Sequence, residues 1–172
     1  MGLVMVFTGD GKGKTTAALG MALRSVGHDM KTVVIQFLKG GTPSGEAVAA
    51  ERFLPGVSIV QAGRPGFLAP GGTSPQDREL AKEALAAVAA LFADGGYDLV
   101  IMDEVNVAIR MGLLSVDEVL EVLAQRRSEQ HVVLTGRWAP PQLVEAADTV
   151  SEIREVKHHF RQGIMAQPGI EF

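Results

Sequence analysis

Short apolar runs alternate with longer amphipathic segments along the whole chain. Six runs rich in valine, isoleucine and leucine predict β-strands, at residues 3–8, 31–37, 57–61, 98–103, 131–135 and 149–156. Several of these runs are continuously apolar, which is typical of parallel strands that are buried on both faces. The segments between them favour helices, at residues 15–26, 45–53, 75–92, 105–110, 116–126 and 140–147.

This alternation predicts an α/β fold with three layers, in which helices cover both faces of a mostly parallel central sheet. Ligands of such sheets bind at the carboxyl ends of the strands. Three chemically notable positions lie at the carboxyl ends of predicted strands: the glycine-rich residues 8–16, Asp103 and Thr135. We therefore expect a ligand site at that edge of the sheet.

A glycine-rich segment joins the first predicted strand to the first predicted helix. It reads Thr8-Gly-Asp-Gly-Lys-Gly-Lys-Thr-Thr16. A turn of this kind gathers backbone N–H groups at the positive end of a helix, where a phosphate chain can bind. Lys14 adds a positive charge, and the Thr15 hydroxyl can reach a magnesium ion.

The match to the P-loop pattern of nucleotide-binding proteins is imperfect, because Thr8 stands where the pattern has its first glycine. A structural glycine turn is the alternative. The strand–turn–helix context and the Gly13-Lys14-Thr15 ending favour a P-loop NTPase-like fold and an ATP site. The predicted ATP-binding residues of the loop are Thr8, Gly9, Asp10, Gly11, Lys12, Gly13, Lys14, Thr15 and Thr16.

The fourth predicted strand ends in Asp103, and a second acidic residue, Glu104, follows it. An apolar strand that ends in aspartate is typical of a magnesium-binding strand, so Asp103 and Thr15 are the predicted metal ligands. Glu104 is a candidate base in an ATPase, or a substrate-holding residue. The pair could instead cap the helix that follows.

Two arginines are further candidates. Arg137 follows the next strand, in Thr135-Gly136-Arg137, and can clamp phosphate or lie on the surface. Arg24 lies ten residues after Lys14 on the first predicted helix, and its position alone favours a solvated charge.

Composition limits the classes of function. At 172 residues we expect one domain over residues 1–172. The formal net charge of −4 gives no sign of nucleic-acid binding. The sequence has no cysteine, which excludes disulfides and thiolate metal sites and fits the reducing cytoplasm. Apolar runs of about 18 residues are absent, so we expect no membrane span.

Two glycine- and proline-rich segments, residues 39–45 and 62–74, are long for a compact domain. Segments of this length often serve as lids or ligand-binding loops, although plain surface loops are the alternative.

Several motifs together resemble the P-loop type of ATP:corrinoid adenosyltransferases, over essentially the whole chain. They are TGDGKGKTTAA (8–18), VIQFLKG (34–40), DLVIMDEVN (98–106), LTGR (134–137), EVKH (155–158) and GIEF (169–172). The resemblance implies transfer of the 5′-deoxyadenosyl group of ATP to cobalt(I) of a reduced corrinoid, with release of triphosphate.

The resemblance also implies roles for individual residues. Negative charge gathers on the departing triphosphate, where Lys12, Lys14, Mg²⁺ and Arg137 can stabilise it. Cobalt(I) has no proton to lose, so Glu104 and Arg24 are expected to hold ATP in its pose rather than act as bases. The predicted catalytic residues are Lys12, Lys14, Glu104 and Arg137.

On the corrinoid side, the resemblance implies that Phe67 contacts the substrate, while Ala69 stands where family members often have tryptophan. It further implies a homodimer, and a flavoprotein reductant is a candidate partner. Two alternatives stay open. One is a P-loop ATPase or kinase that uses Glu104 as its base, and the other is a non-catalytic ATP-binding regulatory module.

Overall fold

A six-stranded, all-parallel sheet forms the centre of the protein in a computed structural model that describes residues 1–66 and 72–171. The strand order is β3-β2-β4-β5-β1-β6. The strands are β1 (Val4–Thr8), β2 (Thr32–Gln36), β3 (Val57–Gln61), β4 (Leu99–Asp103), β5 (His131–Thr135) and β6 (Thr149–Glu152). The predicted parallel sheet is confirmed.

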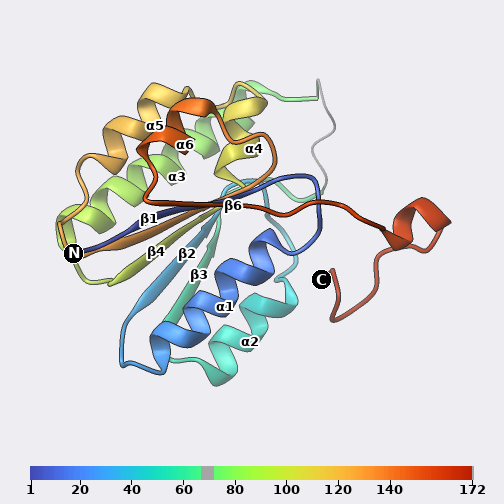
Figure 1. Ribbon diagram of the computed structural model, residues 1–172, viewed down its shortest axis with the longest axis horizontal. Coiled ribbons are helices and arrows are strands. Elements are labelled where there is room, and N and C mark those ends of the chain that lie inside the picture. Colours follow the sequence, from blue (N-terminus) through green and yellow to red (C-terminus); the bar gives the residue numbers. More distant parts are fainter. Residues whose placement is uncertain (67–71, 172) are drawn as a thin grey trace.

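Helices cover both faces of this sheet, which confirms the three layers (Figure 1). The smaller layer holds α1 and α2, and the larger one holds the other four α-helices. Their bounds are α1 (Lys14–Val26), α2 (Gly45–Phe53), α3 (Pro75–Asp94), α4 (Val105–Arg110), α5 (Val116–Leu123) and α6 (Pro141–Ala146). Within the described residues, none of these helices is both long enough and apolar enough to cross a membrane.

Alternation along the strands divides the core between the two layers. In β1, Val4 and Val6 pack in the cluster that contains α3 to α6, whereas Met5 packs in the cluster with Ala18 and Ala22 of α1. Successive side chains of a strand point to opposite faces, so a continuously apolar strand fills both halves of the core. This arrangement explains why the predicted strands lack polar alternation.

Three predicted bounds differ from the structure by two residues or more. The last strand was expected over residues 149–156 but stops at Glu152, because its partner β1 ends at the paired Thr8 and turns into the glycine-rich loop. The predicted helix 116–126 ends at Leu123, and the helix 75–92 continues to Asp94, before Gly95 takes a left-handed conformation (φ 70°). A capping box of Ser74 and Asp77 begins α3, as expected for such a pair.

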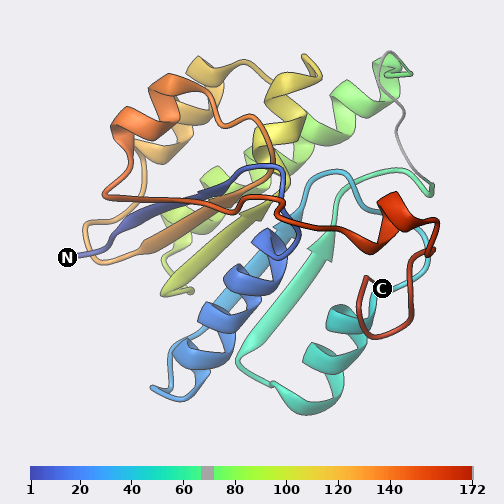
Figure 2. The ribbon, with the colours of Figure 1, turned by 45° about the vertical axis from the view of Figure 1, so that its right-hand side comes forward.

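After β6 the chain runs across the carboxyl edge of the sheet to a short 3₁₀ helix, η1 (His159–Gln162). The two ribbon views agree that the chain then returns toward the start of α1 (Figures 1 and 2). This C-terminal tail, residues 163–171, therefore reaches the same edge of the sheet as the glycine-rich loop.

Candidate functional site

The glycine-rich loop between β1 and α1 has a shape that demands glycine. Gly9 and Gly13 have φ values of 95° and 119°, in the left-handed region that glycine adopts at little cost. A Cβ on Gly11 would lie 2.7 Å from the carbonyl carbon of Arg154. The Gly11 N–H donates to the Ile153 carbonyl over 2.7 Å. The segment after β6 thus fixes one side of this phosphate loop.

Lys14 is the first residue of α1, and its side chain turns back into the loop. Its buried ammonium donates to the carbonyl oxygens of Gly9 and Gly11, over 2.8 and 2.6 Å. Burial lowers the pKa of Lys14; Arg137 lowers it further, while Glu104 opposes the shift. The ammonium group is therefore held within the loop, at the edge of the cavity described below.

Asp103 is the centre of a hydrogen-bond network between strand ends. It is fully buried at the end of β4, and its Oδ1 accepts from the hydroxyls of Thr15 and Thr135, each over 2.7 Å. Thr15 belongs to α1 and Thr135 ends β5, so the structure brings together three elements whose convergence the sequence predicts. Hydroxyl and carboxylate oxygens are the ligands that Mg²⁺ prefers, and this pair of groups fits such an ion.

Glu104 has a left-handed backbone, with φ of 64°, which is uncommon for a residue other than glycine. Its N–H donates to the Thr135 hydroxyl over 2.9 Å, and this bond helps to fix the conformation. Glu104 stands at the N-cap position of α4, yet within the described residues its side chain makes no capping hydrogen bond. The carboxyl instead lines the cavity.

Burial, followed by the charge of Asp103, raises the pKa of Glu104 above its ordinary value, against the opposing charges of Lys14, Lys39 and Arg137. A glutamate of this kind is able to take up a proton more readily than an exposed one. The site thus contains a carboxyl group with a raised pKa, that of Glu104, next to the Asp103 carboxylate, which two hydroxyl donors hold in place.

A second polar cluster, formed by Gln36, Lys39 and Glu46, adjoins Asp103. The Gln36 amide donates to Glu46 over 2.9 Å and to Asp103 Oδ2 over 3.4 Å. The Lys39 ammonium lies 3.0 Å from Glu46 Oε1 and 3.6 Å from Asp103 Oδ2. Burial acts to raise the pKa of Glu46, but the Gln36 hydrogen bond, a backbone N–H and the Lys39 charge outweigh it and lower that pKa to about 2.

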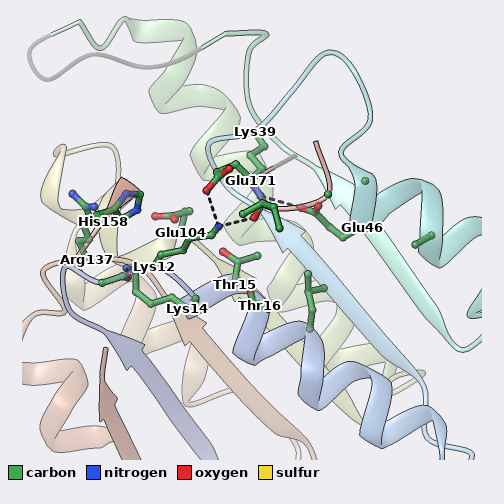
Figure 3. Close-up of a pocket in the computed structure, with 17 residues that line it drawn as sticks. Lys12, Lys14, Thr15, Thr16, Lys39, Glu46, Glu104, Arg137, His158 and Glu171 are labelled. Carbon is green, nitrogen blue, oxygen red and sulfur yellow. Dashed lines mark hydrogen bonds and ion pairs between the residues drawn. The ribbon is translucent and has the colours of Figure 1, made fainter. Parts of the chain in front are cut away.

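A cavity of about 750 Å³ joins the phosphate loop to this cluster (Figure 3). Its size is in the usual range for sites that take nucleotides and other small molecules. Its polar lining comes from the loop and the start of α1, from α2, from the segments that follow β2, β4 and β5, and from the chain after β6. The polar residues labelled in the close-up are Lys12, Lys14, Thr15, Thr16, Lys39, Glu46, Glu104, Arg137, His158 and Glu171.

The tail closes one side of this cavity. Lys12 donates to the Ile170 carbonyl over 2.6 Å and lies 3.4 Å from Glu171 Oε1. His159 Nε2 lies 3.2 Å from the same oxygen. Arg137, which also lines the cavity, donates to the Asp10 carbonyl over 3.1 Å. Like Lys14, the cationic side chains of Lys12 and Arg137 thus border the cavity while bonded to the protein's own oxygen atoms.

Other predicted site residues lie elsewhere. Arg24 is exposed in the last turn of α1, ten residues from Lys14 and so about 15 Å along the helix axis. Among the residues that the structure describes, it is not part of the cavity lining. Thr8 accepts from the Ala139 N–H over 3.2 Å, which ties the loop to the chain after β5. Phe67, together with Ala69, lies outside the described residues.

The sequence interpretation missed Lys39 and Glu46 as individual site residues. A signal was present, because Lys39 is part of the VIQFLKG motif (34–40) and begins the glycine-rich segment 39–45. Lys39 and Gly45, at the two ends of that segment, do line the cavity. The alternative of a plain surface loop therefore does not describe these two ends.

The fold and the phosphate loop define an α/β protein of the P-loop NTPase-like class. A solved structure in the same fold is the flagellar accessory protein FlaH from Methanocaldococcus jannaschii, with a TM-score of 0.59 and 11% identity, covering 88% of this chain and 70% of that one. At this identity the likeness concerns the fold alone. Within that class, the chain belongs to the ATP:corrinoid adenosyltransferase BtuR/CobO/CobP family, whose model matches residues 1–172.

Individual relatives agree with this assignment. The corrinoid adenosyltransferase of Pseudomonas aeruginosa is 46% identical over 173 residues, which cover 99% of this chain and 84% of that protein. That of Escherichia coli K12 is 40% identical over 171 residues, and corrinoid adenosyltransferase CobA of Salmonella typhimurium is 41% identical over 175. In both cases 99% of this chain and 86% of the relative are covered. The resemblance stated from the motifs is confirmed.

Proposed function

We propose that this chain transfers the 5′-deoxyadenosyl group of ATP to cobalt(I) of a reduced corrinoid, as one domain over residues 1–172. The cobalt lone pair attacks the ribose C5′, and the C5′–O bond breaks. The electron pair of that bond leaves with the triphosphate. The observation that carries the proposal is the joint occurrence of family membership and a cavity that the phosphate loop borders.

The chain's own groups suit this bond cleavage, because they offer positive charge where the leaving group gathers negative charge. The loop N–H groups and the Lys14 ammonium face the place of the triphosphate. Lys12 and Arg137 border the same cavity, and each can exchange a protein carbonyl for a phosphate oxygen. For Lys12 that exchange also releases the Ile170 and Glu171 end of the tail.

Thr15 and Asp103 are the residues that we propose as Mg²⁺ ligands, the latter through its carboxylate. When bound, the ion supplies charge neutralisation on the triphosphate. The hydroxyl of Thr135 keeps the Asp103 carboxylate in place, and the oxygen-only set of donors suits a hard cation.

Glu104 has a positioning role in this proposal. Attack by cobalt(I) releases no proton, so the reaction needs no general base. The carboxyl lines the cavity and the fixed left-handed backbone aims it. We propose that it holds the sugar end of ATP, while Phe67 contacts the corrinoid.

The proposal extends to the protein's surroundings on the strength of the family resemblance. It includes a homodimer, a flavoprotein that reduces the corrinoid, and a cytoplasmic location. Sedimentation of the purified protein tests the first, since a monomer at assay concentrations contradicts it. Exchange of chemical reductant for a reduced flavoprotein in the transfer assay tests the second.

The experiment that tests the function mixes purified protein, ATP, Mg²⁺ and chemically reduced cobalamin in the dark. We expect a light-sensitive adenosyl product and free triphosphate in equal amounts. A reaction without protein and one with the variant Lys14→Met serve as controls. Formation of ADP and phosphate, with no cobalt–carbon product, contradicts the proposal.

The alternative of an ATPase has one observation in its favour, the raised pKa of Glu104 beside Asp103. It predicts ADP formation without corrinoid, and loss of that activity in Glu104→Gln. If, without corrinoid, the wild-type protein hydrolyses ATP no faster than the Lys14→Met variant, this alternative is excluded. Tight ATP binding without either reaction favours the regulatory module.

A further inference from the structure

Lys39 lies between two carboxylates in the candidate site, and neither it nor Glu46 has a role in the function proposed above. Its ammonium is 3.0 Å from Glu46 and 3.6 Å from Asp103. The side chain is 37% exposed, whereas the Asp103 side chain is fully buried. A partly exposed ammonium that lines the cavity thus neutralises a buried carboxylate beside it.

The two oxygens of Asp103 have different partners. Oδ1 accepts from Thr15 and Thr135, and Oδ2 faces Gln36 and Lys39. A divalent cation held by Thr15 and Asp103 would share its carboxylate with the Lys39 ammonium. Two cations around one carboxylate repel each other strongly when they are a few ångströms apart and half-buried. Metal binding therefore favours departure of the ammonium from Asp103.

The Lys39 side chain can move from Asp103 into the cavity. Lys39 begins the segment 39–45 and lines the same cavity as Lys14. Its flexible four-carbon side chain lets the ammonium move by several ångströms. Glu46, in the first turn of α2, keeps the Gln36 hydrogen bond when Lys39 leaves. The Glu46 carboxylate therefore still accepts a hydrogen bond after Lys39 has moved away.

We propose that Lys39 is an exchangeable cation of this site, which occupies Asp103 and Glu46 until a divalent ion replaces it and then binds the triphosphate. The inference rests on the proposed function for the position of metal and triphosphate, and it adds a positioning residue to that function. One charge is used twice: it first stabilises the buried carboxylate and then the leaving group.

This exchange couples two ligands. A triphosphate that draws Lys39 away from Asp103 opens the carboxylate to the metal, and a metal that expels Lys39 supplies a cation to the triphosphate. Each ligand must then raise the affinity for the other by the same factor. Part of that factor disappears when the side chain at position 39 has no charge.

The test measures binding of Mn²⁺, by the electron paramagnetic resonance of the free ion, and of inorganic tripolyphosphate, by calorimetry. Each is measured alone and in the presence of the other. The proteins are wild type, Lys39→Met, Lys39→Arg and the matched control Lys82→Met. Lys82 pairs with Glu118 at 3.5 Å and is 55% exposed, outside the cavity.

For Lys39→Met we expect Mn²⁺ alone to bind about fivefold more tightly, because a competing cation is gone. Tripolyphosphate alone should bind about tenfold more weakly. The factor by which each ligand promotes the other should fall about fivefold, within the usual range of such couplings. Lys39→Arg should restore most of the coupling, and Lys82→Met should match wild type.

An unchanged coupling factor in Lys39→Met overturns the proposal, even if both single affinities shift, because a stationary charge changes the two affinities independently. Should Lys39→Met fail to fold, Lys39→Gln takes its place, since its amide can still donate to Glu46. The measurements contain neither ATP nor corrinoid. If adenosyl transfer fails but the coupling factor falls in Lys39→Met, only the proposed function is contradicted. If transfer occurs but the coupling factor is unchanged in Lys39→Met, only the exchange is contradicted.

Discussion

Replacement of Thr135 by valine tests whether the strand-end network stabilises the fold as described. The Thr135 hydroxyl donates to Asp103 over 2.7 Å and accepts the Glu104 N–H over 2.9 Å, in a fully buried position. Valine has nearly the same shape, so the change removes two hydrogen bonds and leaves little or no cavity. The strained backbone of Glu104 loses its acceptor at the same time.

The magnitude follows from these two bonds. A hydrogen bond to a carboxylate contributes about 1.5–3 kcal/mol, and a buried N–H without an acceptor costs about 1–3 kcal/mol. Thr15 still donates to Asp103, which reduces the loss. We expect the free energy of unfolding to fall by about 3 kcal/mol, and the melting temperature by about 10 °C for a chain of this size.

The assay is equilibrium urea unfolding, followed by circular dichroism, with thermal unfolding as a second measure. Thr135→Ser is the matched control, because it keeps both hydrogen bonds and loses one buried methyl, at a cost of about 1 kcal/mol. The reasoning is refuted if the valine variant lies within about 0.5 kcal/mol of wild type. It is equally refuted if serine destabilises as much as valine.

Three further predictions concern the loop and the start of α3. Lys14→Met should lower adenosyl transfer at least 100-fold, because it removes a charge from the leaving group, while the melting temperature stays within a few degrees. Gly11→Ala should abolish ATP binding by calorimetry, since its Cβ would lie 2.7 Å from the Arg154 carbonyl carbon and push the loop out of shape; a normal ATP affinity contradicts the close approach. Hydrogen bonds from Arg64, at 2.5 and 2.6 Å, hold the pKa of Asp77 well below its usual value. In acid the folded state therefore binds fewer protons than the unfolded state. The stabilisation by this pair is complete above about pH 4, and it is lost as the pH falls through the pKa that Asp77 has in the folded state. Arg64→Gln should shift the midpoint of acid unfolding to higher pH, and an unchanged midpoint contradicts the role of this pair.

The part of the site that follows β1, β4 and β5 could be predicted because it depends on local rules. Parallel strands place their carboxyl ends at one edge, and a glycine-rich turn before a helix predicts a phosphate loop. Thr15, Asp103 and Thr135 follow from those rules without knowledge of the strand order. Their mutual hydrogen bonds depend, in addition, on β5 lying between β4 and β1 in the sheet.

The contacts of Lys39 with Asp103 could not be predicted in this way, because they depend on which strands are neighbours. β2 lies beside β4 in the sheet, with Gln36 paired to Asp103 in register. The alternation of strands and helices does not give that order. The pairing of Lys12 with Glu171 is harder still to predict, since the two residues lie 159 positions apart in the chain and the tail has weak periodicity.

The strand order also determines when the protein can become complete during synthesis. β1 is the first strand to leave the ribosome, yet its neighbours are β5 and β6, the last two. Its apolar residues, Val4 to Phe7, must wait with both backbone edges unpaired until residues 131–152 have been made. An unpaired apolar strand invites pairing with other chains. We therefore expect nascent chains that stop before β5 to aggregate, or to need a chaperone, far more than the finished protein does.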